Sequence, residues 1–131
     1  MNTYRRHARE PRRCLIVDDS QLIRTVARKI IQEIGLDAEE APDGYAALDA
    51  CSVSMPEAIL LDWSMPHMNG IAFLKTLRAQ PDGARPVVIF CTTEEDAGHI
   101  EEALTAGAND YLMKPYDGES LLAKFTQMGL V

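Results

Sequence analysis

The chain has 131 residues, of which 47% are hydrophobic and 25% are charged, and its net charge is −7. This length suits one domain with its own core and is short for two, and the composition is that of a globular protein. No apolar run approaches the ~18 residues that a membrane span requires, and no secretory signal precedes the first charged residues. We therefore expect a cytoplasmic protein without a membrane span.

Charge is divided unevenly along the chain. Residues 1–13 contain five arginines and one glutamate, a net charge of +4, which leaves −11 of the total for the remainder. An acidic body argues against nucleic-acid binding through the folded surface. We divide the chain into a basic, flexible arm at 1–12 and a domain at 13–131. The arm is either a disordered leader segment without a specific role or a contact for an anion, a membrane surface or an acidic partner.

The cysteines and histidines indicate no metal or disulfide framework. The cysteines are odd in number, widely spaced and set in apolar segments, which is typical of reduced core residues. They are Cys14, Cys51 and Cys91. The three histidines lack metal-ligand spacing, so we expect them to be exposed.

The first half of the domain predicts two strand–helix units. An apolar run at 14–17 predicts a strand, and Ser20 and Gly35 suit the N-cap and the left-handed C-cap of the helix that follows. The apolar face of this helix repeats at helical spacing. It consists of Ile23, Val26, Ala27, Ile30, Ile31 and Ile34. A more polar strand at 36–41 suits a sheet edge, and the turn at 42–44 caps a second helix that continues through Cys51.

The run at 58–62 predicts the central strand of the sheet. It is apolar up to Asp62, as expected for a strand buried on both faces of a parallel sheet. A third helix begins at Asn69 and ends before the turn at 81–83. Its predicted core residues are Ile71, Phe73, Leu74 and Leu77.

Two further units complete the pattern. A strand at 87–91 ends in Thr92, and an acidic helix at about 94–106 follows, with Ile100, Ala103 and Leu104 as its inner face. A strand at 109–113 precedes a last helix from about 118. This helix is expected to bury Leu121, Leu122, Phe125 and Met128. Five alternating strands and helices predict an α/β fold, a doubly wound (βα)5 parallel sheet in a three-layer α/β/α sandwich.

Polar residues follow the predicted strands where each one ends. Asp18 and Asp19 follow the first strand, Asp62 ends the third, and Thr92 and Lys114 follow the fourth and fifth. Carboxyl ends of parallel strands share one edge, so these groups should meet there. Crowded carboxylates repel one another and favour a hard divalent cation, Mg²⁺ with Mn²⁺ as a substitute. Together with a lysine and a hydroxyl group, carboxylates that bind such a cation can stabilise phosphoryl transfer. Asp62 is the expected nucleophile.

Several dispersed segments resemble one known family. They are Leu15-Ile16-Val17-Asp18-Asp19-Ser20, Leu60-Leu61-Asp62-Trp63-Ser64-Met65-Pro66-His67-Met68-Asn69-Gly70, Thr92 and Tyr111-Leu112-Met113-Lys114-Pro115. Over roughly residues 13–128 they look like a receiver domain of two-component response regulators, close to the stand-alone chemotaxis (CheY-like) type. The resemblance implies a flavodoxin-like fold.

The resemblance implies how phosphorylation would proceed. Asp62 would accept a phosphoryl group from a phosphohistidine on a histidine kinase or a histidine phosphotransfer protein. Asp19, Asp62 and the backbone carbonyl of Ser64 would bind Mg²⁺ directly, and Asp18 would act through a water molecule. Ser64 and Glu94 would set the lifetime of the acyl phosphate. The chain would assist its own phosphorylation without being an enzyme in the usual sense.

The resemblance also implies how the signal would be passed on. Thr92 would hydrogen-bond the phosphoryl oxygen, Lys114 would pair with it, and the Lys114–Pro115 bond would be cis. Tyr111 would turn inward and change the partner affinity of a face built from the fourth helix, fifth strand and fifth helix. Without a DNA-binding output domain, a monomer or weak dimer would then control a downstream target protein.

Plainer interpretations remain open beside these. The aspartates could be capping or solvated acids, Thr92 an ordinary N-cap that shares its role with Thr93, and Tyr111 a plain core or edge aromatic. An aspartate-nucleophile phosphatase of the haloacid dehalogenase kind needs a second acid two residues after the nucleophile, where Ser64 stands. A further alternative is a phosphorylation-independent adaptor, or a cyclic-dinucleotide-binding module that uses the arginine arm.

Overall fold

The computed structural model of the protein describes residues 12–131, so the predicted arm lies outside the described residues except for Arg12. Five parallel strands form one sheet in the order β2-β1-β3-β4-β5. They are β1 Arg13–Val17, β2 Asp37–Ala41, β3 Ala58–Asp62, β4 Val87–Thr92 and β5 Asp110–Met113. The predicted parallel sheet is confirmed, and the polar strand β2 lies at an edge as expected.

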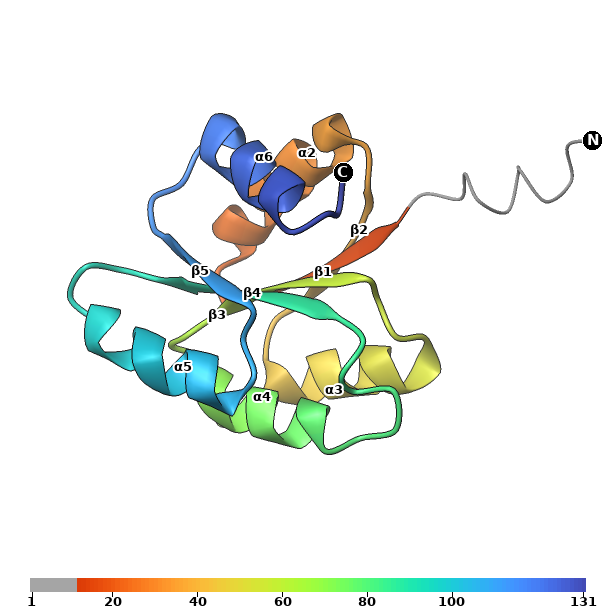
Figure 1. Ribbon diagram of the computed structural model, residues 1–131, viewed down its shortest axis with the longest axis vertical. Helices are drawn as coiled ribbons and strands as arrows, with labels where there is room; N and C mark the ends of the chain where they lie inside the picture. The colour runs from red at the N-terminus through yellow and green to blue at the C-terminus, as the bar shows by residue number, and fades with distance from the viewer. Residues whose placement is uncertain (1–11) are drawn as a thin grey trace, which may run out of the picture.

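Helices cover both faces of the sheet, which gives three layers (Figure 1). They are α2 Gln21–Ile34, α3 Gly44–Val53, α4 Gly70–Arg78, the short 3-10 helix η1 Ala97–His99, α5 Ile100–Ala106 and α6 Gly118–Gln127. Helices α2 and α6 lie on one face, and α3, α4 and α5 lie on the other. No helix among residues 12–131 is long and apolar enough to cross a membrane.

The core consists of two apolar layers, one on each face of the sheet. The layer under α3, α4 and α5 contains Phe73 and Phe90, and the layer under α2 and α6 contains Phe125, all of them fully buried. Burying one such side chain contributes about 1.5–3 kcal/mol to stability. All three cysteines are free and buried, as predicted.

The predicted helix ends are found where capping residues stand. Ser20 accepts a hydrogen bond from the backbone N–H of Ile23, and Gly35 adopts a left-handed φ of 114° at the other end of α2. Asp43 and Asn69 cap α3 and α4 in the same way. Capping side chains therefore fix how the chain leaves β1, β2 and β3 at the edge where the polar residues gather.

Three sequence predictions about the helices are wrong. The segment at 94–99 is a turn and η1 rather than α-helix, because Gly98 has low helix propensity and no side chain caps the start of either η1 or α5. Leu104 and Leu122 are 41% and 46% exposed rather than buried, and Val26 on α2 is 49% exposed. Helical spacing places a residue near the apolar stripe but does not say how wide the covered stripe is.

Candidate functional site

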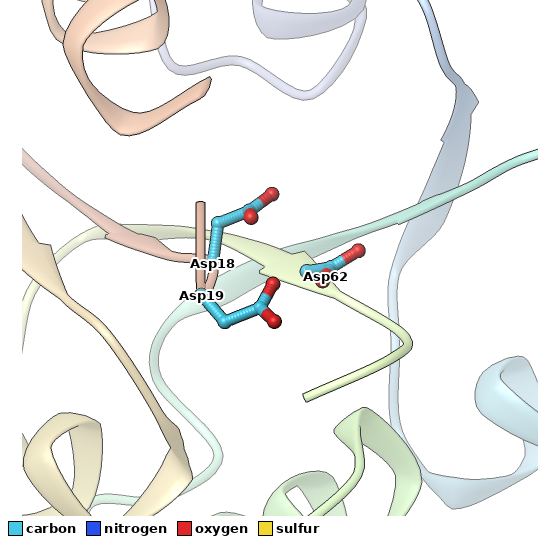
Figure 2. Close-up of side chains that lie close together, drawn as sticks. All are labelled: Asp18, Asp19 and Asp62. Carbon is cyan, nitrogen blue, oxygen red and sulfur yellow. The ribbon is translucent and has the colours of Figure 1, made fainter. Parts of the chain in front are cut away.

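Three carboxylates meet at the carboxyl edge of the sheet, as predicted (Figure 2). Strands β1 and β3 are neighbours with Val17 opposite Leu61, so Asp18, which follows β1, lies beside Asp62, which ends β3. One oxygen each of Asp18, Asp19 and Asp62 lies within 4.8 Å of the others. Asp18 and Asp62 are buried at 4% and 8% exposure, whereas Asp19 is exposed.

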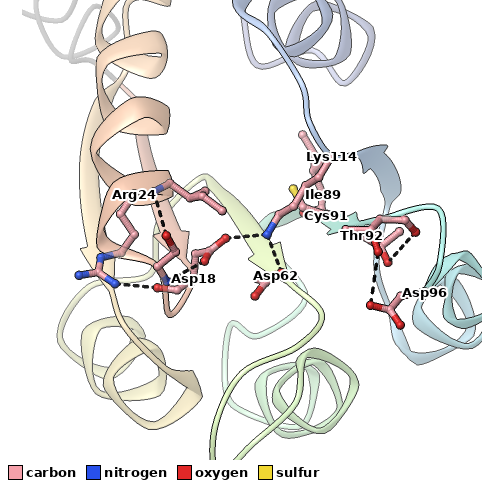
Figure 3. Close-up of polar contacts among 11 residues, drawn as sticks. Asp18, Arg24, Asp62, Ile89, Cys91, Thr92, Asp96 and Lys114 are labelled. Carbon is pink, nitrogen blue, oxygen red and sulfur yellow. Dashed lines mark hydrogen bonds and ion pairs between the residues drawn. The ribbon is translucent and has the colours of Figure 1, made fainter.

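Lys114 holds two of these acids together (Figure 3). It follows β5 and reaches across β4, so that its Nζ donates to Asp18 Oδ2 at 2.8 Å and to Asp62 Oδ1 at 2.7 Å. Its backbone N–H donates to the carbonyl of Thr92 at 2.7 Å, and the Lys114–Pro115 peptide bond is cis, the isomer that the family resemblance implied. Burial alone would lower the pKa of Lys114, but its bonds to the two acids outweigh burial and raise the pKa above its usual value.

The environment of Asp62 raises the pKa of its carboxyl group. Burial raises the pKa of Asp62 from 3.8 to about 6, and the hydrogen bond from Lys114 opposes this without cancelling it. The charges of Asp18 and Asp19 make smaller contributions to the same rise, which is to about 6 in total. A cation among these oxygens would remove the repulsion and stabilise the ionised form.

The chemistry of these donors fits a hard divalent cation. Carboxylate oxygens are the ligands that Mg²⁺ prefers, usually with several waters in the remaining positions. Asp18 already accepts from the backbone N–H of Ser20 with Oδ1 and from Lys114 with Oδ2. Asp19 and Asp62 are therefore the better candidates for direct ligands, with Asp18 in a supporting position. Ser64, whose carbonyl was the further predicted ligand, lies in the exposed loop after β3.

Thr92 lies at the site but points elsewhere. It ends β4, is 1% exposed, and its hydroxyl donates to the carbonyl of Thr93 at 3.5 Å. In this arrangement the hydroxyl is not bonded to Asp62. Glu94, two residues further on, is exposed in the loop after β4, and Ser64 is exposed in the loop after β3. Both predicted lifetime-tuning residues thus lie in loops at the carboxyl edge of the sheet.

Tyr111 lies on the neighbouring strand with its side chain partly in solvent. Strand β5 pairs with β4 so that Tyr111 stands opposite Phe90, and its side chain is 39% exposed. Lys124 of α6 lies over its ring, with Nζ 5.4 Å from the centroid, and forms an ion pair with Asp110 at 3.1 Å. The structure therefore has Tyr111 in an outward position.

Three side-chain contacts near the site have no signal in the sequence. Arg24 of α2 donates to the backbone carbonyl of Asp18 at 2.8 Å and pairs with Glu40 of β2. His99, expected to be merely exposed, stacks on Trp63 with ring centroids 3.8 Å apart. Neither spacing nor residue type shows such pairs, because the partners come from elements that only the fold brings together.

The chain is similar to known proteins over most of its length. The family model described as the response regulator receiver domain matches residues 14–126. Chemotaxis protein CheY-3 of Vibrio cholerae is 33% identical over 115 residues, which cover 87% of this chain and 88% of that protein. Response regulator MprA of a Mycobacterium species is 36% identical over 114 residues, 87% of this chain and 49% of that protein. The solved structure of V. cholerae chemotaxis protein CheY4 matches with a TM-score of 0.85 at 31% identity, and covers 90% of this chain and 98% of that one.

Proposed function

This chain belongs to the response regulator receiver domain family, and we propose that it is a phosphoacceptor switch of two-component signalling. Asp62 takes a phosphoryl group from a phosphohistidine of a histidine kinase or a histidine phosphotransfer protein. The modified chain then controls a downstream target protein in the cytoplasm, as a monomer or weak dimer. The observation that carries the proposal is the position of Lys114, which contacts Asp18 and Asp62 at once.

The phosphoryl transfer uses the carboxylate of Asp62 as the nucleophile. One of its oxygens bonds to phosphorus while the bond between phosphorus and the donor imidazole nitrogen breaks, and the imidazole leaves with the bonding pair. Negative charge on the phosphoryl oxygens is met by Lys114, whose raised pKa keeps it cationic throughout the physiological range. The chain aligns and stabilises this transfer rather than acting as an enzyme on a separate substrate.

Mg²⁺ would supply charge neutralisation between the carboxylates and the incoming phosphoryl group. Asp19 and Asp62 would hold it, with the Ser64 carbonyl completing the protein ligands, and Asp18 would orient a bound water. The two hydrogen bonds that already occupy the oxygens of Asp18 support this division. Mn²⁺ has the same preference for oxygen ligands and would substitute.

Signal output would use the face formed by α5, β5 and α6. Thr92 would leave the Thr93 carbonyl and donate to the phosphoryl group, and Tyr111 would move inward from its exposed position. Leu104 and Tyr111, 41% and 39% exposed, give this face apolar area that a partner could cover. The change is a shift between two populations of one chain, driven by the new charge at Asp62.

The single tryptophan provides a direct test of the proposal. Trp63 follows Asp62, so its fluorescence should change when Mg²⁺ is added and change again with a small phosphodonor such as acetyl phosphate. The phosphodonor response should vanish in Asp62→Ala and persist in Asp49→Ala, which removes an exposed acid of α3. A wild-type chain that shows no phosphodonor response and takes up no phosphoryl group from a histidine kinase would contradict the proposal. It would favour the phosphorylation-independent adaptor.

A further inference from the structure

A stacked pair of rings joins the end of β3 to the helix η1 at the rim of the site. The indole of Trp63 and the imidazole of His99 lie within 22° of parallel, with centroids 3.8 Å apart. Trp63 directly follows Asp62 at the end of β3, and His99 is the last residue of η1 and the N-cap of α5. The stack therefore connects the residue next to the phosphoacceptor with the start of the helix that follows Thr92.

The tryptophan side of this pair is firmly held. The backbone N–H of Trp63 donates to the carbonyl of Cys91 at 3.2 Å, and its carbonyl accepts from Gly70 at 3.0 Å. Its ring forms an edge-to-face pair with Phe90, with centroids 6.2 Å apart and planes at 60°, and Phe90 is fully buried. Trp63 is thus tied to the next strand, to the start of α4 and to the core.

The histidine side has few other restraints. Within η1 and α5, both of which the structure describes in full, only Ala103 is buried, and no side chain caps either helix. Glu102 contributes a carboxylate oxygen 3.6 Å from Nδ1 of His99, and both side chains are partly exposed. A segment with so little buried area opens at low free-energy cost unless a specific contact holds it.

The loop at 93–98 is held at both of its ends. This loop leaves β4 at Thr92, carries the exposed Glu94, and reaches His99, where the stack returns it to the residue after Asp62. We propose that His99 is a positioning residue for the reaction at Asp62. Its stack on Trp63 holds the loop over the rim and limits the access of water to the aspartyl phosphate. This inference rests on the proposed function.

The affected step is hydrolysis of the aspartyl phosphate. A water oxygen bonds to phosphorus while the bond between phosphorus and the Asp62 carboxylate oxygen breaks. The products are the free carboxylate and inorganic phosphate; one proton of the water stays on its oxygen, now part of the phosphate, and the other passes to a second phosphate oxygen or to solvent. Holding the loop in place leaves this chemistry unchanged and reduces how often a water molecule reaches the phosphorus.

The test compares the lifetime of the aspartyl phosphate among variants of residue 99. His99→Ala should shorten the lifetime about three- to tenfold, the range expected for losing one stacked aromatic pair. His99→Phe keeps a flat ring and should retain the wild-type lifetime. Thr105→Ala, an exposed position on the same helix, is the matched control and should have no effect.

A second measurement needs neither metal nor phosphate. Because the chain has one tryptophan, collisional quenching of its fluorescence by acrylamide reports the exposure of Trp63 alone. His99→Ala should raise the quenching constant in the metal-free protein about twofold or more, since it uncovers one face of the indole. His99→Phe and Thr105→Ala should leave the constant near the wild-type value.

The outcomes separate the inference from the function on which it rests. A wild-type chain that takes up no phosphoryl group contradicts the proposed function and the inference with it. A phosphorylated wild type whose lifetime is unchanged in His99→Ala contradicts the inference alone. A lifetime shortened equally by His99→Phe also overturns it, because the ring stack would then not be the cause. Two double variants test the stack itself, both in the His99→Phe background. If Trp63→Phe keeps the lifetime of the aspartyl phosphate and Trp63→Ala shortens it, the ring stack is responsible.

Discussion

The acid-bearing strands and the segment after Thr92 lie side by side at the same edge of the sheet, but they are packed very differently. Around β1 and β3, Asp18 and Asp62 are nearly inaccessible, and Lys114 contacts both at hydrogen-bonding distance. Across η1 and α5, which lie wholly within the described residues, Ala103 alone is buried.

This difference separates two requirements of a switch. Transition-state charge is stabilised best by groups that are already fixed, because they need no reorganisation during the reaction. A surface that must change its partner affinity needs an element that moves at a cost of a few kcal/mol. In the switch that we propose, the carboxylates and Lys114 would meet the first requirement, and η1 with α5, which bury little, would meet the second.

The largest expected contrast is between two lysines that each pair with acid. Lys114→Ala leaves Asp18 and Asp62 together without a cation, and breaking such a buried pair should lower the metal-free free energy of unfolding by about 2–4 kcal/mol. Lys124→Ala removes the more exposed pair with Asp110 at the start of β5, and should cost about 1 kcal/mol or less. Urea unfolding of both variants measures the difference.

The same lysine variant also tests signal output. Lys114→Ala should retain Mg²⁺ binding, because Lys114 is not a metal ligand, while phosphorylation should no longer change the affinity for a partner. Mg²⁺ binding is measured by the fluorescence of Trp63. The affinity for the partner is measured separately, with and without phosphodonor. An unchanged phosphorylation effect in Lys114→Ala would show that the lysine does not couple the phosphoryl group to the output face.

A smaller effect is expected from neutralising Asp62 itself. The folded protein keeps a proton on Asp62 up to about pH 6, whereas the unfolded chain releases it near 3.8. The metal-free free energy of unfolding should therefore fall as the pH rises through this interval. Asp62→Asn should abolish that dependence and stabilise the metal-free protein at pH 7 by about 1–2 kcal/mol, allowing for partial screening by water. Urea unfolding of the wild type and of Asp62→Asn at pH 4.5 and pH 7 measures this pH dependence, and equal dependence in the two proteins would contradict the prediction.

The raised pKa of Asp62 also predicts how metal binding depends on pH. Mg²⁺ binds the ionised carboxylate, so protons compete with it below about pH 6. The apparent affinity for Mg²⁺ should fall by about tenfold for each pH unit below that value and level off above it. Titration of Trp63 fluorescence between pH 5 and pH 8 measures this dependence, and a constant affinity would contradict the environment assigned to Asp62.

The smallest change in stability is expected on the loosely packed side. Leu104 is 41% exposed on α5, so Leu104→Ala should alter the free energy of unfolding by about 0.5 kcal/mol or less. Leu74→Ala, the matched change in the core layer beneath α4, should cost about 2–5 kcal/mol. If the output face is used as proposed, Leu104→Ala should nevertheless weaken binding of the target.

The polar residues of the site could be named from the sequence because each one ends an apolar run. The apolar runs predict strands, and strands that alternate with helices in a parallel sheet bring their carboxyl ends to one edge. The sequence alone therefore predicts that Asp18, Asp62, Thr92 and Lys114 lie together. Helix ends followed from Ser20, Gly35 and Asn69 because capping is a local interaction.

Contacts between elements distant in sequence were decided only by the tertiary structure. Periodicity does not reveal which strands are neighbours, so it cannot predict the strand order β2-β1-β3-β4-β5. The same holds for the bridge from Lys114 to two acids and for the stack of His99 on Trp63. The exposure of Leu104 and Leu122 was also hidden, because an apolar residue is buried only where a neighbouring element covers it. Local backbone preferences and apolar patterning depend on residues that are near one another in the sequence, whereas pairing across the sheet depends on how all the layers pack together.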